Sequence, residues 1–354
     1  MENETLDTAQ PIETEQEPFK CTTMEDLLRD IQLEDPTFQP DTNIYKLRPD
    51  PDISQLIPLT FDQLAQDKPK PLEHVLYPCL PTQGIGWVYA ATGLGKTLFS
   101  LNLAYAIAAG GNFLKYSCPK PRKVLYVDGE MAYSQLHSRI MQIASVQGDL
   151  DFTENFMVLT PDKVYPMRVP HIDTEMGQEL YVKLIEKYNT EVVIFDNLSM
   201  LSSFDENKSN EWKPIQDWIL YLRSKGVTVI IVHHSGKSGD YRGTSRMLDC
   251  ADVAIALEPV NHDKLESEDP LIKQFKVTYK KTRIFGGKDA LPLEVSLDNG
   301  YWSHKSMEQT ELDKVIELNA LGLSQRDMAR DSNISQSKIC RLLKRAKALK
   351  LIKD

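Results

Sequence analysis

A glycine-rich stretch at residues 90–97, AATGLGKT, has the residue types that bind phosphate. It follows a short apolar run at 86–90 and opens a helical pattern at 96–109. Its two glycines let backbone N–H groups turn inward around a phosphate, and the amino end of the next helix adds positive potential. The stretch fits the Walker A pattern, with alanine in place of the first glycine. A chance glycine-rich turn is the alternative, and the flanking strand and helix argue against it.

The residues of this stretch have distinct expected roles toward a nucleoside triphosphate. Lys96 is expected to reach the β- and γ-phosphates, and the hydroxyl of Thr97 to bind Mg²⁺. Asp196 ends the apolar run VVIFD and fits a Walker B carboxylate that holds Mg²⁺ through water. An ordinary acid at the end of a strand is the alternative for Asp196. ATP and Mg²⁺ are the expected cofactors, and the nucleotide-binding residues are predicted to be Ala91, Thr92, Gly93, Leu94, Gly95, Lys96, Thr97 and Leu98.

Two acids in the run VLYVDGE compete for the role of general base. Glu130 ends the run, where a carboxylate could take a proton from an attacking water. Asp128 lies two residues earlier and shares the same face of the strand, so spacing alone does not choose between them. His233 and His234 end the run VTVIIVHH, where a polar tip can sense the γ-phosphate. A structural histidine is the alternative there.

These residues need a scaffold that alternates strands and helices. Unbroken runs of Val, Ile, Tyr and Phe are typical of a parallel sheet covered by helices on both faces. After Ala251 four short runs, DVAIALEP, KQFKVTYKK, PLEVSL and YWS, are expected to add consecutive antiparallel strands at the sheet edge. The predicted class is α/β. The expected strands lie at 86–90, 123–130, 156–160, 192–199 and 227–234, and the expected helices at 96–109, from 132, at 174–188 and at 209–224.

The order AATGLGKT, YVDGE, VVIFDNLS, IIVHHSGK resembles the RecA/DnaB superfamily of P-loop ATPases. A glutamate at the end of the strand after the Walker A helix separates RecA-like ATPases from most other P-loop proteins. The resemblance is strongest to the RepA-type hexameric replicative helicases of plasmids and phages, which also have the His-His pair, and it covers about residues 60–305. It implies a RecA-like fold, a hexameric ring with ATP at subunit interfaces, Glu130 as catalytic base and His234 as γ-phosphate sensor.

The resemblance also implies that a basic pair on a late strand reaches the neighbouring subunit's nucleotide. Lys281 and Arg283, in TYKKTRIFGG, match the K-x-R spacing of that pair. Such groups stabilise the negative charge that spreads over the γ-phosphoryl oxygens in the transition state. A solvated basic hairpin is the alternative, and Lys280 leaves the assignment open by one position.

Two segments after the catalytic strands correspond to the loops that line the central channel and grip single-stranded DNA in the resembled family. Residues 202–211 are acidic on balance, with Lys208 as the only basic residue, which weakens their case. Residues 235–246 combine glycines with basic residues and suit backbone phosphates, with a switch or interface role as the alternative. The basic residues of this second segment are Lys237, Arg242 and Arg246.

The last 45 residues are predicted to form a separate basic module. A helix at 310–320 is followed by a second at 324–330 with Ser324 as N-cap, and a third starts at 335. The pattern GLSQ, MA and ISQS resembles the helix-turn-helix of small bacterial regulators and recombinases. A helical protein-docking domain is the alternative. The residues expected to contact duplex DNA are Gln336, Ser337, Lys338, Arg341, Lys344 and Arg345.

The formal net charge of −10 comes wholly from the beginning of the chain. Residues 1–70 hold 16 acidic residues against 6 basic ones, while 310–354 hold 10 basic against 6 acidic. The acidic, proline-rich part cannot bury enough apolar surface to offset its ordering entropy. We therefore expect a disordered leader at 1–40, a RecA-like domain at 41–305 whose lead-in at 41–80 packs partly on the core, and a helix-turn-helix domain at 310–354. The leader is interpreted as a solubilising tail or a partner-binding arm.

Composition excludes several classes of protein. Hydrophobic residues make up 41% of the 354, which supports a real core. No apolar run reaches the roughly 18 residues that a membrane span needs, and the amino terminus lacks the pattern of a secretory signal. Five cysteines without a C-x-x-C pair indicate reduced thiols rather than a disulfide framework. We expect a cytoplasmic protein that does not bind membranes.

Together these features predict an ATP-dependent DNA motor, namely the hexameric replicative helicase of a plasmid, phage or other mobile element. A single strand would occupy the channel, and duplex DNA would bind the carboxyl-terminal domain. The alternative is a RecA-like ATPase that acts on DNA as a regulator or loader without unwinding it. A third possibility is an ATPase whose last domain binds a protein partner.

Overall fold

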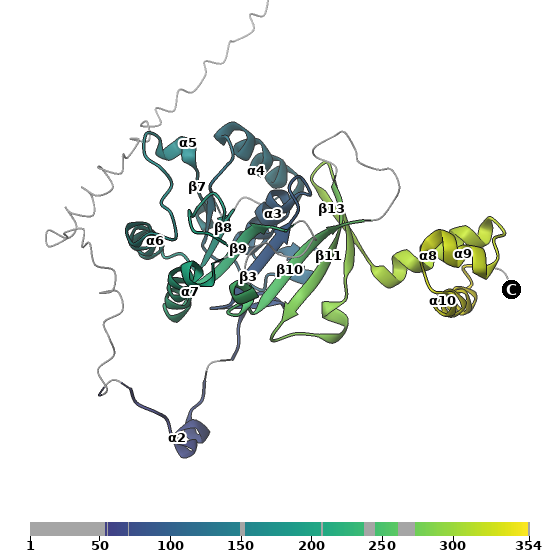
Figure 1. The fold of residues 1–354 in the computed structure, drawn as a ribbon, viewed down its shortest axis with the longest axis horizontal. Helices are drawn as coiled ribbons and strands as arrows, with labels where there is room; N and C mark the ends of the chain where they lie inside the picture. Colours follow the sequence, from purple (N-terminus) through teal and green to yellow (C-terminus); the bar gives the residue numbers. More distant parts are fainter. Residues whose placement is uncertain are drawn as a thin grey trace, which may run out of the picture. The chain divides into compact units, whose positions relative to one another are not determined.

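The structure is a computed structural model that describes residues 54, 56–69, 71–148, 153–206, 208–236, 245–260 and 273–352. It has a nine-stranded sheet with helices on both faces (Figure 1). The strand order is β13-β12-β11-β10-β3-β9-β8-β6-β7. The six strands from β10 to β7 run parallel, and the three at the other edge are antiparallel. The predicted α/β class, with a parallel sheet and antiparallel strands at one edge, is confirmed.

The parallel strands are the apolar runs of the sequence. They are β3 (Ile85–Ala90), β6 (Val124–Asp128), β7 (Phe156–Leu159), β8 (Val192–Asp196), β9 (Thr228–His234) and β10 (Val253–Pro259). The last of these corrects a prediction, because DVAIALEP was expected to be antiparallel. β10 instead pairs in parallel with β3 and in antiparallel with β11. The antiparallel pairing therefore begins one strand later than predicted, between β10 and β11 (Lys273–Thr282).

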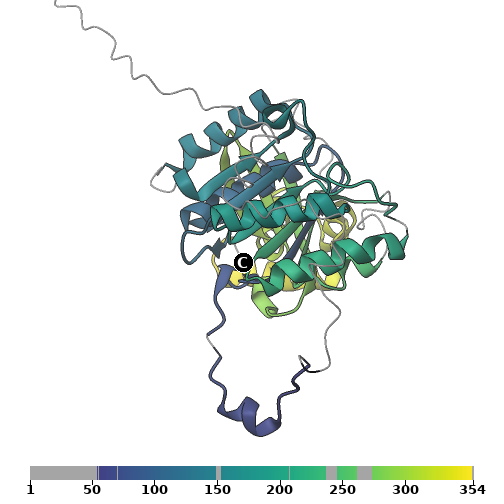
Figure 2. The same ribbon diagram turned by 90° about the vertical axis from the view of Figure 1, so that its left-hand side faces the viewer.

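Side chains alternate between the two faces of the central strands and so build two separate cores. On β8, Val192 and Ile194 enter one core while Val193 and Phe195 enter the other. The helices α3 (Lys96–Ala109) and α4 (Tyr133–Gln147) cover the first face. The helices α6 (Glu175–Tyr188) and α7 (Ser209–Ser224) cover the second, and Figure 2 looks onto this layer. The sheet is thus buried on both sides, which explains its unbroken apolar strands.

The remaining elements connect or extend this sheet. The hairpin β1 (His74–Leu76) and β2 (Leu80–Pro81) leads into β3, and β4 (Asn112–Phe113) pairs with β5 (Tyr116–Ser117) after α3. The edge strands are β12 (Leu293–Asp298) and β13 (Tyr301–Ser306). The short helical elements are α5 (Pro161–Val164), η3 (Thr153–Asn155), η4 (Ser245–Leu248) and η5 (Gly287–Ala290).

The described part of the lead-in packs on the core through its last residues. The helix α2 (Phe61–Gln66) begins at a capping box in which Thr60 and Gln63 exchange side-chain and backbone hydrogen bonds, yet none of its residues is buried. Large apolar side chains before and within it are exposed, Phe61 by 80%. Among the described residues, the first buried one is Val75, which belongs to the first core. The leader predicted at 1–40 lies outside the described residues.

The carboxyl-terminal helices form at the predicted places around a third apolar cluster. They are α8 (Met307–Ala320), α9 (Gln325–Ser332) and α10 (Gln336–Ala348). Ser324 caps α9 by accepting from the backbone N–H of Asp327, and Asn333 takes the left-handed conformation that ends it. The predicted apolar face of α10, with Ile339, Leu342 and Leu343, is buried. Within the described part of the chain, no helix is long and apolar enough to cross a membrane.

Candidate functional site

The glycine-rich stretch forms the turn between β3 and α3, as its composition requires. Gly93 and Gly95 have φ values of 83° and 105°, in the left-handed region that favours glycine. A Cβ built on Gly93 meets no atom within 4 Å, so open space lies over this glycine. The helix begins at Lys96, and its first N–H groups therefore surround the turn. The backbone of this turn therefore has the left-handed residues that the two glycines of the predicted phosphate loop led us to expect.

Lys96, Thr97 and Asp196 come together at the carboxyl ends of β3 and β8, which β9 separates in the sheet. The hydroxyl of Thr97 hydrogen-bonds to the carboxylate of Asp196. Burial lowers the pKa of Lys96, and the charges of Asp196 and Glu130 oppose that shift. Burial raises the pKa of Asp196, opposed by hydrogen bonds from Tyr126 and Thr97 and by the charge of Lys96. Four residues predicted separately from the sequence thus act on one another electrostatically.

Tyr126 is a member of this cluster that sequence reasoning missed. Its hydroxyl donates to Asp196 Oδ2 at 2.5 Å from the middle of β6. The hydroxyl of Ser100, on α3, lies 3.5 Å from the same oxygen. Both side chains hold one oxygen of the carboxylate, so its orientation is fixed before any ligand arrives. The sequence signal was the alternation of β6, which places Tyr126 and Asp128 on one face.

The structure separates the two candidate bases. Asp128 is buried, and its Oδ2 accepts from the backbone N–H of Met131 at 2.9 Å and lies 3.5 Å from the hydroxyl of Thr160. Burial raises the pKa of Asp128 to about 7, and the N–H of Met131 opposes the shift. Glu130 is exposed, and its charge acts on both Lys96 and Asp196. Only Glu130 combines solvent access with nearness to the phosphate-binding lysine, which favours it as the base.

Asn197 holds Glu130 in place, and no role for it was predicted. Its side-chain Nδ2 donates to Glu130 Oε2 at 2.8 Å, and its Oδ1 accepts from the backbone N–H of Met200 at 3.1 Å. The segment that carries Glu130 packs closely against Met200 because residue 129 is a glycine. A Cβ at Gly129 would lie only 2.9 Å from Cβ of Met200. The sequence signal was slight, namely an amide directly after Asp196.

The two histidines at the end of β9 have different surroundings. His234 Nδ1 lies 3.3 Å from the hydroxyl of Thr92 in the phosphate loop, so it stands where a γ-phosphate sensor was expected. His233 is fully buried, and its Nε2 lies 3.7 Å from Glu206 Oε2. The register pairs His234 with Ala90, the last residue of β3. The sensor role of His234 stays a prediction, and His233 fits the structural alternative.

The basic pair Lys281 and Arg283 is occupied within its own chain. Lys281 Nζ donates to the backbone carbonyls of Leu248 and Asp249 at 2.6 and 3.0 Å. Arg283 forms an ion pair of 3.2 Å with the buried carboxylate of Asp252, whose other oxygen accepts from the N–H of Ile85. The end of β11 lies beside the start of β10, at the sheet edge opposite the phosphate loop. The third basic residue, Lys280, pairs with Glu258 at 2.6 Å.

The residues predicted to contact single-stranded DNA are described only in part. Lys237 and Arg242 lie outside the described residues. Arg246 is exposed in η4, just before the turn that binds Lys281. Lys208 forms ion pairs with Asp205 and Glu211 at 3.6 and 2.9 Å, so its charge is engaged locally.

The predicted DNA-contacting residues of α10 divide into two groups. Lys338 Nζ lies 2.6 Å from both oxygens of Glu311, and Arg345 pairs with Glu308, so both cations bind α8. Gln336, Ser337, Arg341 and Lys344 are exposed. Sequence reasoning grouped all six because it did not foresee that two of them hold α10 against α8.

The comparison with protein families agrees with this geometry. The family model described as an AAA domain matches residues 50–240. The chain belongs to this family of P-loop ATPases. No curated protein matches it significantly. The matched range of this AAA-domain ATPase contains the phosphate loop, Glu130, Asp196, Asn197 and His234.

Family membership implies a nucleotide and usually Mg²⁺, and the residues fit both. The open turn at Gly93 and the amino end of α3 suit phosphates, while Thr97 and Asp196 supply the hard oxygen ligands that Mg²⁺ prefers. When bound, the ion would neutralise charge on the β- and γ-phosphates. Lys96 would add a second positive charge, and Glu130, held by Asn197, would orient and deprotonate water.

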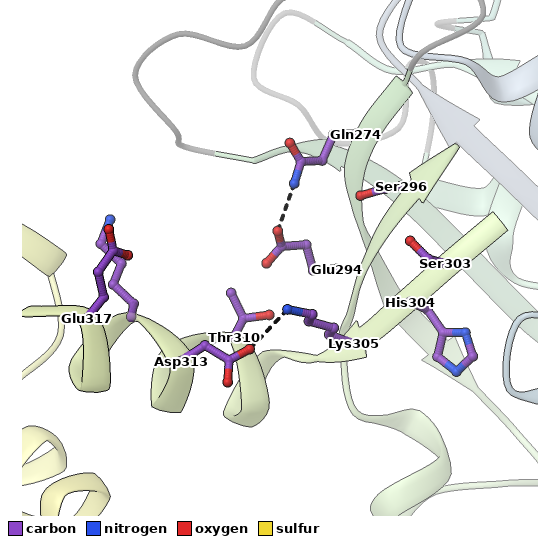
Figure 3. Close-up of a pocket in the computed structure, with 10 residues that line it drawn as sticks. Gln274, Glu294, Ser296, Ser303, His304, Lys305, Thr310, Asp313 and Glu317 are labelled. Carbon is purple, nitrogen blue, oxygen red and sulfur yellow. Dashed lines mark hydrogen bonds and ion pairs between the residues drawn. The ribbon is translucent and has the colours of Figure 1, made fainter. Parts of the chain in front are cut away.

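A pocket of about 350 Å³ lies away from this site, between the edge strands and α8 (Figure 3). Its walls are polar, with Gln274 Nε2 donating to Glu294 at 2.9 Å and Lys305 pairing with Asp313 at 3.0 Å. None of the predicted site residues that the structure describes lines it. The Lys305–Asp313 pair connects β13 to α8, which indicates a structural role at this junction.

Proposed function

We propose that this AAA-domain ATPase is a DNA-dependent motor, the hexameric replicative helicase of a plasmid, phage or other mobile element. The supporting observation is the connection between hydrolysis residues and candidate DNA segments. The segment predicted at 202–211 follows Asp196 and Asn197, and the segment at 235–246 follows His234 directly. Each therefore begins next to a side chain that contacts the nucleotide machinery, so γ-phosphate loss can move it.

The carboxyl-terminal helices fit a duplex-binding role in the same proposal. The exposed residues Gln336 and Ser337 stand in the first turn of α10, where recognition helices contact base edges. Arg341 and Lys344 follow on its exposed surface and suit backbone phosphates. Such a module would bring the motor to its origin sequence.

A regulator or loader that does not unwind DNA is the second candidate. The observation in its favour is that Arg283 and Lys281 bind their own chain, whereas a ring motor of the resembled type uses such a pair on its neighbour. ATP would then act as a switch for assembly on DNA.

The proposal is tested by ATP hydrolysis with and without a single-stranded oligonucleotide. Stimulation by the strand, absent in Lys96→Ala, is expected. Mass photometry with ATP and Mg²⁺ should show six copies. A turnover rate that the strand does not change would contradict a DNA-dependent motor.

A further inference from the structure

A second pocket, of about 410 Å³, lies at the carboxyl ends of β6, β7 and β8, next to the candidate base. One wall comes from α5 and the residues after it, including Tyr165, Arg168 and His171. The other wall is Gly129 with Met200 and Leu201, directly after the Walker B strand. In open α/β sheets, ligands bind outside the carboxyl ends of the strands, and this pocket has that position.

The chemistry of the pocket is one exposed aromatic ring beside one exposed cation. Tyr165 is 79% exposed in the described part of the chain, so its ring is open to a ligand. Arg168 is exposed, and within the described part of the chain it forms no ion pair or hydrogen bond. Met200 adds a polarizable apolar surface that is 48% exposed. A ring and a guanidinium at one site suit a base and its phosphate.

The acids near the pocket bind backbone N–H groups and do not pair with Arg168. Asp162 Oδ2 accepts from the backbone N–H of Tyr133 at 2.7 Å, and Asp173 Oδ2 accepts from that of Ser203 at 2.8 Å. Hydrogen bonds to backbone N–H groups satisfy the carboxylate oxygens that would otherwise attract the guanidinium. Within the described part of the chain, the guanidinium of Arg168 forms no ion pair with these acids and is available to a phosphate.

The two walls are joined into one rigid unit. The N–H of Ile172 donates to the carbonyl of Leu201 at 2.8 Å, and His171 Nδ1 lies 3.0 Å from the hydroxyl of Ser203. With the Asp173–Ser203 bond, three contacts tie residues 171–173 to 201–203. A ligand in the pocket therefore touches a preformed surface.

We infer that this pocket is a binding subsite for one nucleotide of a single strand, with the base on Tyr165 and its phosphate on Arg168. The inference rests on the proposed DNA-dependent function and adds a third contact region to the two predicted segments. It also has a route to the chemistry. The N–H of Met200, in the pocket wall, donates to Asn197, and Asn197 donates to Glu130. A DNA strand that moves Met200 would therefore disturb the hydrogen bond by which Asn197 orients Glu130, the candidate general base.

The inference is tested by binding of a fluorescent oligo-dT strand and by ATPase assays. Tyr165→Ala is expected to weaken strand binding about tenfold, because base–aromatic stacking contributes at that level. Arg168→Ala should reduce the slope of log binding constant against log salt by about 0.7, the value for one phosphate of a single strand. Basal ATP hydrolysis should stay unchanged in both, while stimulation by the strand falls. Tyr165→Phe, which keeps the ring, should behave as the wild type.

Two matched controls and a direct measurement complete the experiment. Tyr301→Ala removes a ring on β13 that is 66% exposed, and Lys288→Ala removes an exposed cation on η5. Neither change should affect strand binding. An iodouridine-substituted strand should crosslink to Tyr165 in the presence of ATP, and an excess of any other free nucleotide should not reduce the crosslink.

If the wild type is stimulated by the strand but Tyr165→Ala and Arg168→Ala match their controls, the subsite is wrong and the motor proposal stands. If the strand has no effect on the wild type, the motor proposal itself fails. If free dTMP displaces the strand at micromolar concentration, the pocket takes mononucleotides and the inference is overturned.

Discussion

The side-chain amide of Asn197 donates to the carboxylate of Glu130 across a distance of 2.8 Å. This bond links the segment directly after Asp196, the predicted Mg²⁺-binding carboxylate, to Glu130, the residue best placed to activate water. The rate acceleration from a general base depends strongly on its orientation, because a misplaced carboxylate cannot reach the proton of the attacking water.

Loss of this bond should slow hydrolysis without weakening nucleotide binding. Asn197→Ala is expected to lower kcat about tenfold with little change in KM, since the amide orients the base and does not touch the phosphates. Asn197→Asp should also move the acid limb of the pH–rate profile to higher pH by about one unit, because a second carboxylate disfavours the charged base. Steady-state ATPase assays from pH 5 to 9 measure both. An unchanged profile in Asn197→Asp would mean that Asn197 has only a structural role.

Asp128 should affect stability and leave hydrolysis intact. Its pKa is raised by burial to about 7 from an ordinary value near 4, so between these pH values the folded state keeps a proton that the unfolded state has lost. Its contribution to stability is therefore present at low pH and disappears as pH rises through 7.

Asp128→Asn removes this titration and can still accept from Met131. Relative to wild type, the variant should gain roughly 1–3 kcal/mol in the free energy of unfolding between pH 5 and pH 8. Urea unfolding at both pH values measures the difference, and ATPase assays should show near-normal turnover. A variant that folds but does not hydrolyse ATP would make Asp128 the base.

Arg283 should stabilise the fold through Asp252. Removing Arg283 leaves the buried carboxylate of Asp252 with the longer ion pair to Arg223 at 3.7 Å, and the partial exposure of Arg283 reduces the effect further. Arg283→Ala is expected to cost about 1–2 kcal/mol of stability, measured by urea unfolding. A double-mutant cycle with Asp252→Asn should recover most of that cost as coupling. Normal stability of Arg283→Ala combined with lost hydrolysis would instead support the predicted contact with a neighbour's nucleotide.

The two groups of cations on α10 should behave differently. Arg341→Ala and Lys344→Ala are expected to weaken duplex DNA binding severalfold and to lower its salt dependence by about one phosphate each. Lys338→Ala should instead lower the melting temperature, because its partner Glu311 on α8 loses its counter-charge. Fluorescence anisotropy and thermal unfolding separate these effects. Equal loss of DNA binding in all three variants would show that the Lys338 ion pair opens on DNA.

Local features of the fold were predictable because short-range sequence determines them. The turn at Gly93 and Gly95 needs left-handed backbone, and α3 begins at Lys96 where the sequence places it. Strand-end acids were found for the same reason, since parallel strands present their carboxyl ends at one edge. The choice between Asp128 and Glu130 needed the structure, because burial separates residues that spacing makes equivalent.

Features that depend on pairing between distant segments were not predictable. The direction of β10 depends on its neighbour β3, about 165 residues earlier, and no local pattern encodes it. The ion pairs of Lys338 and Arg345 with α8 depend on helix packing. The bond between Asn197 and Glu130 joins two strands in the same way.

The most direct test of the central claim is strand displacement on a forked duplex. With ATP and Mg²⁺ the wild type should separate the strands, while Glu130→Gln should bind the fork and ATP but separate nothing. Loss of a general base typically costs at least about a hundredfold in rate, so the contrast is large. A wild-type protein that hydrolyses ATP on the fork and displaces no strand would contradict the motor and favour the regulator or loader.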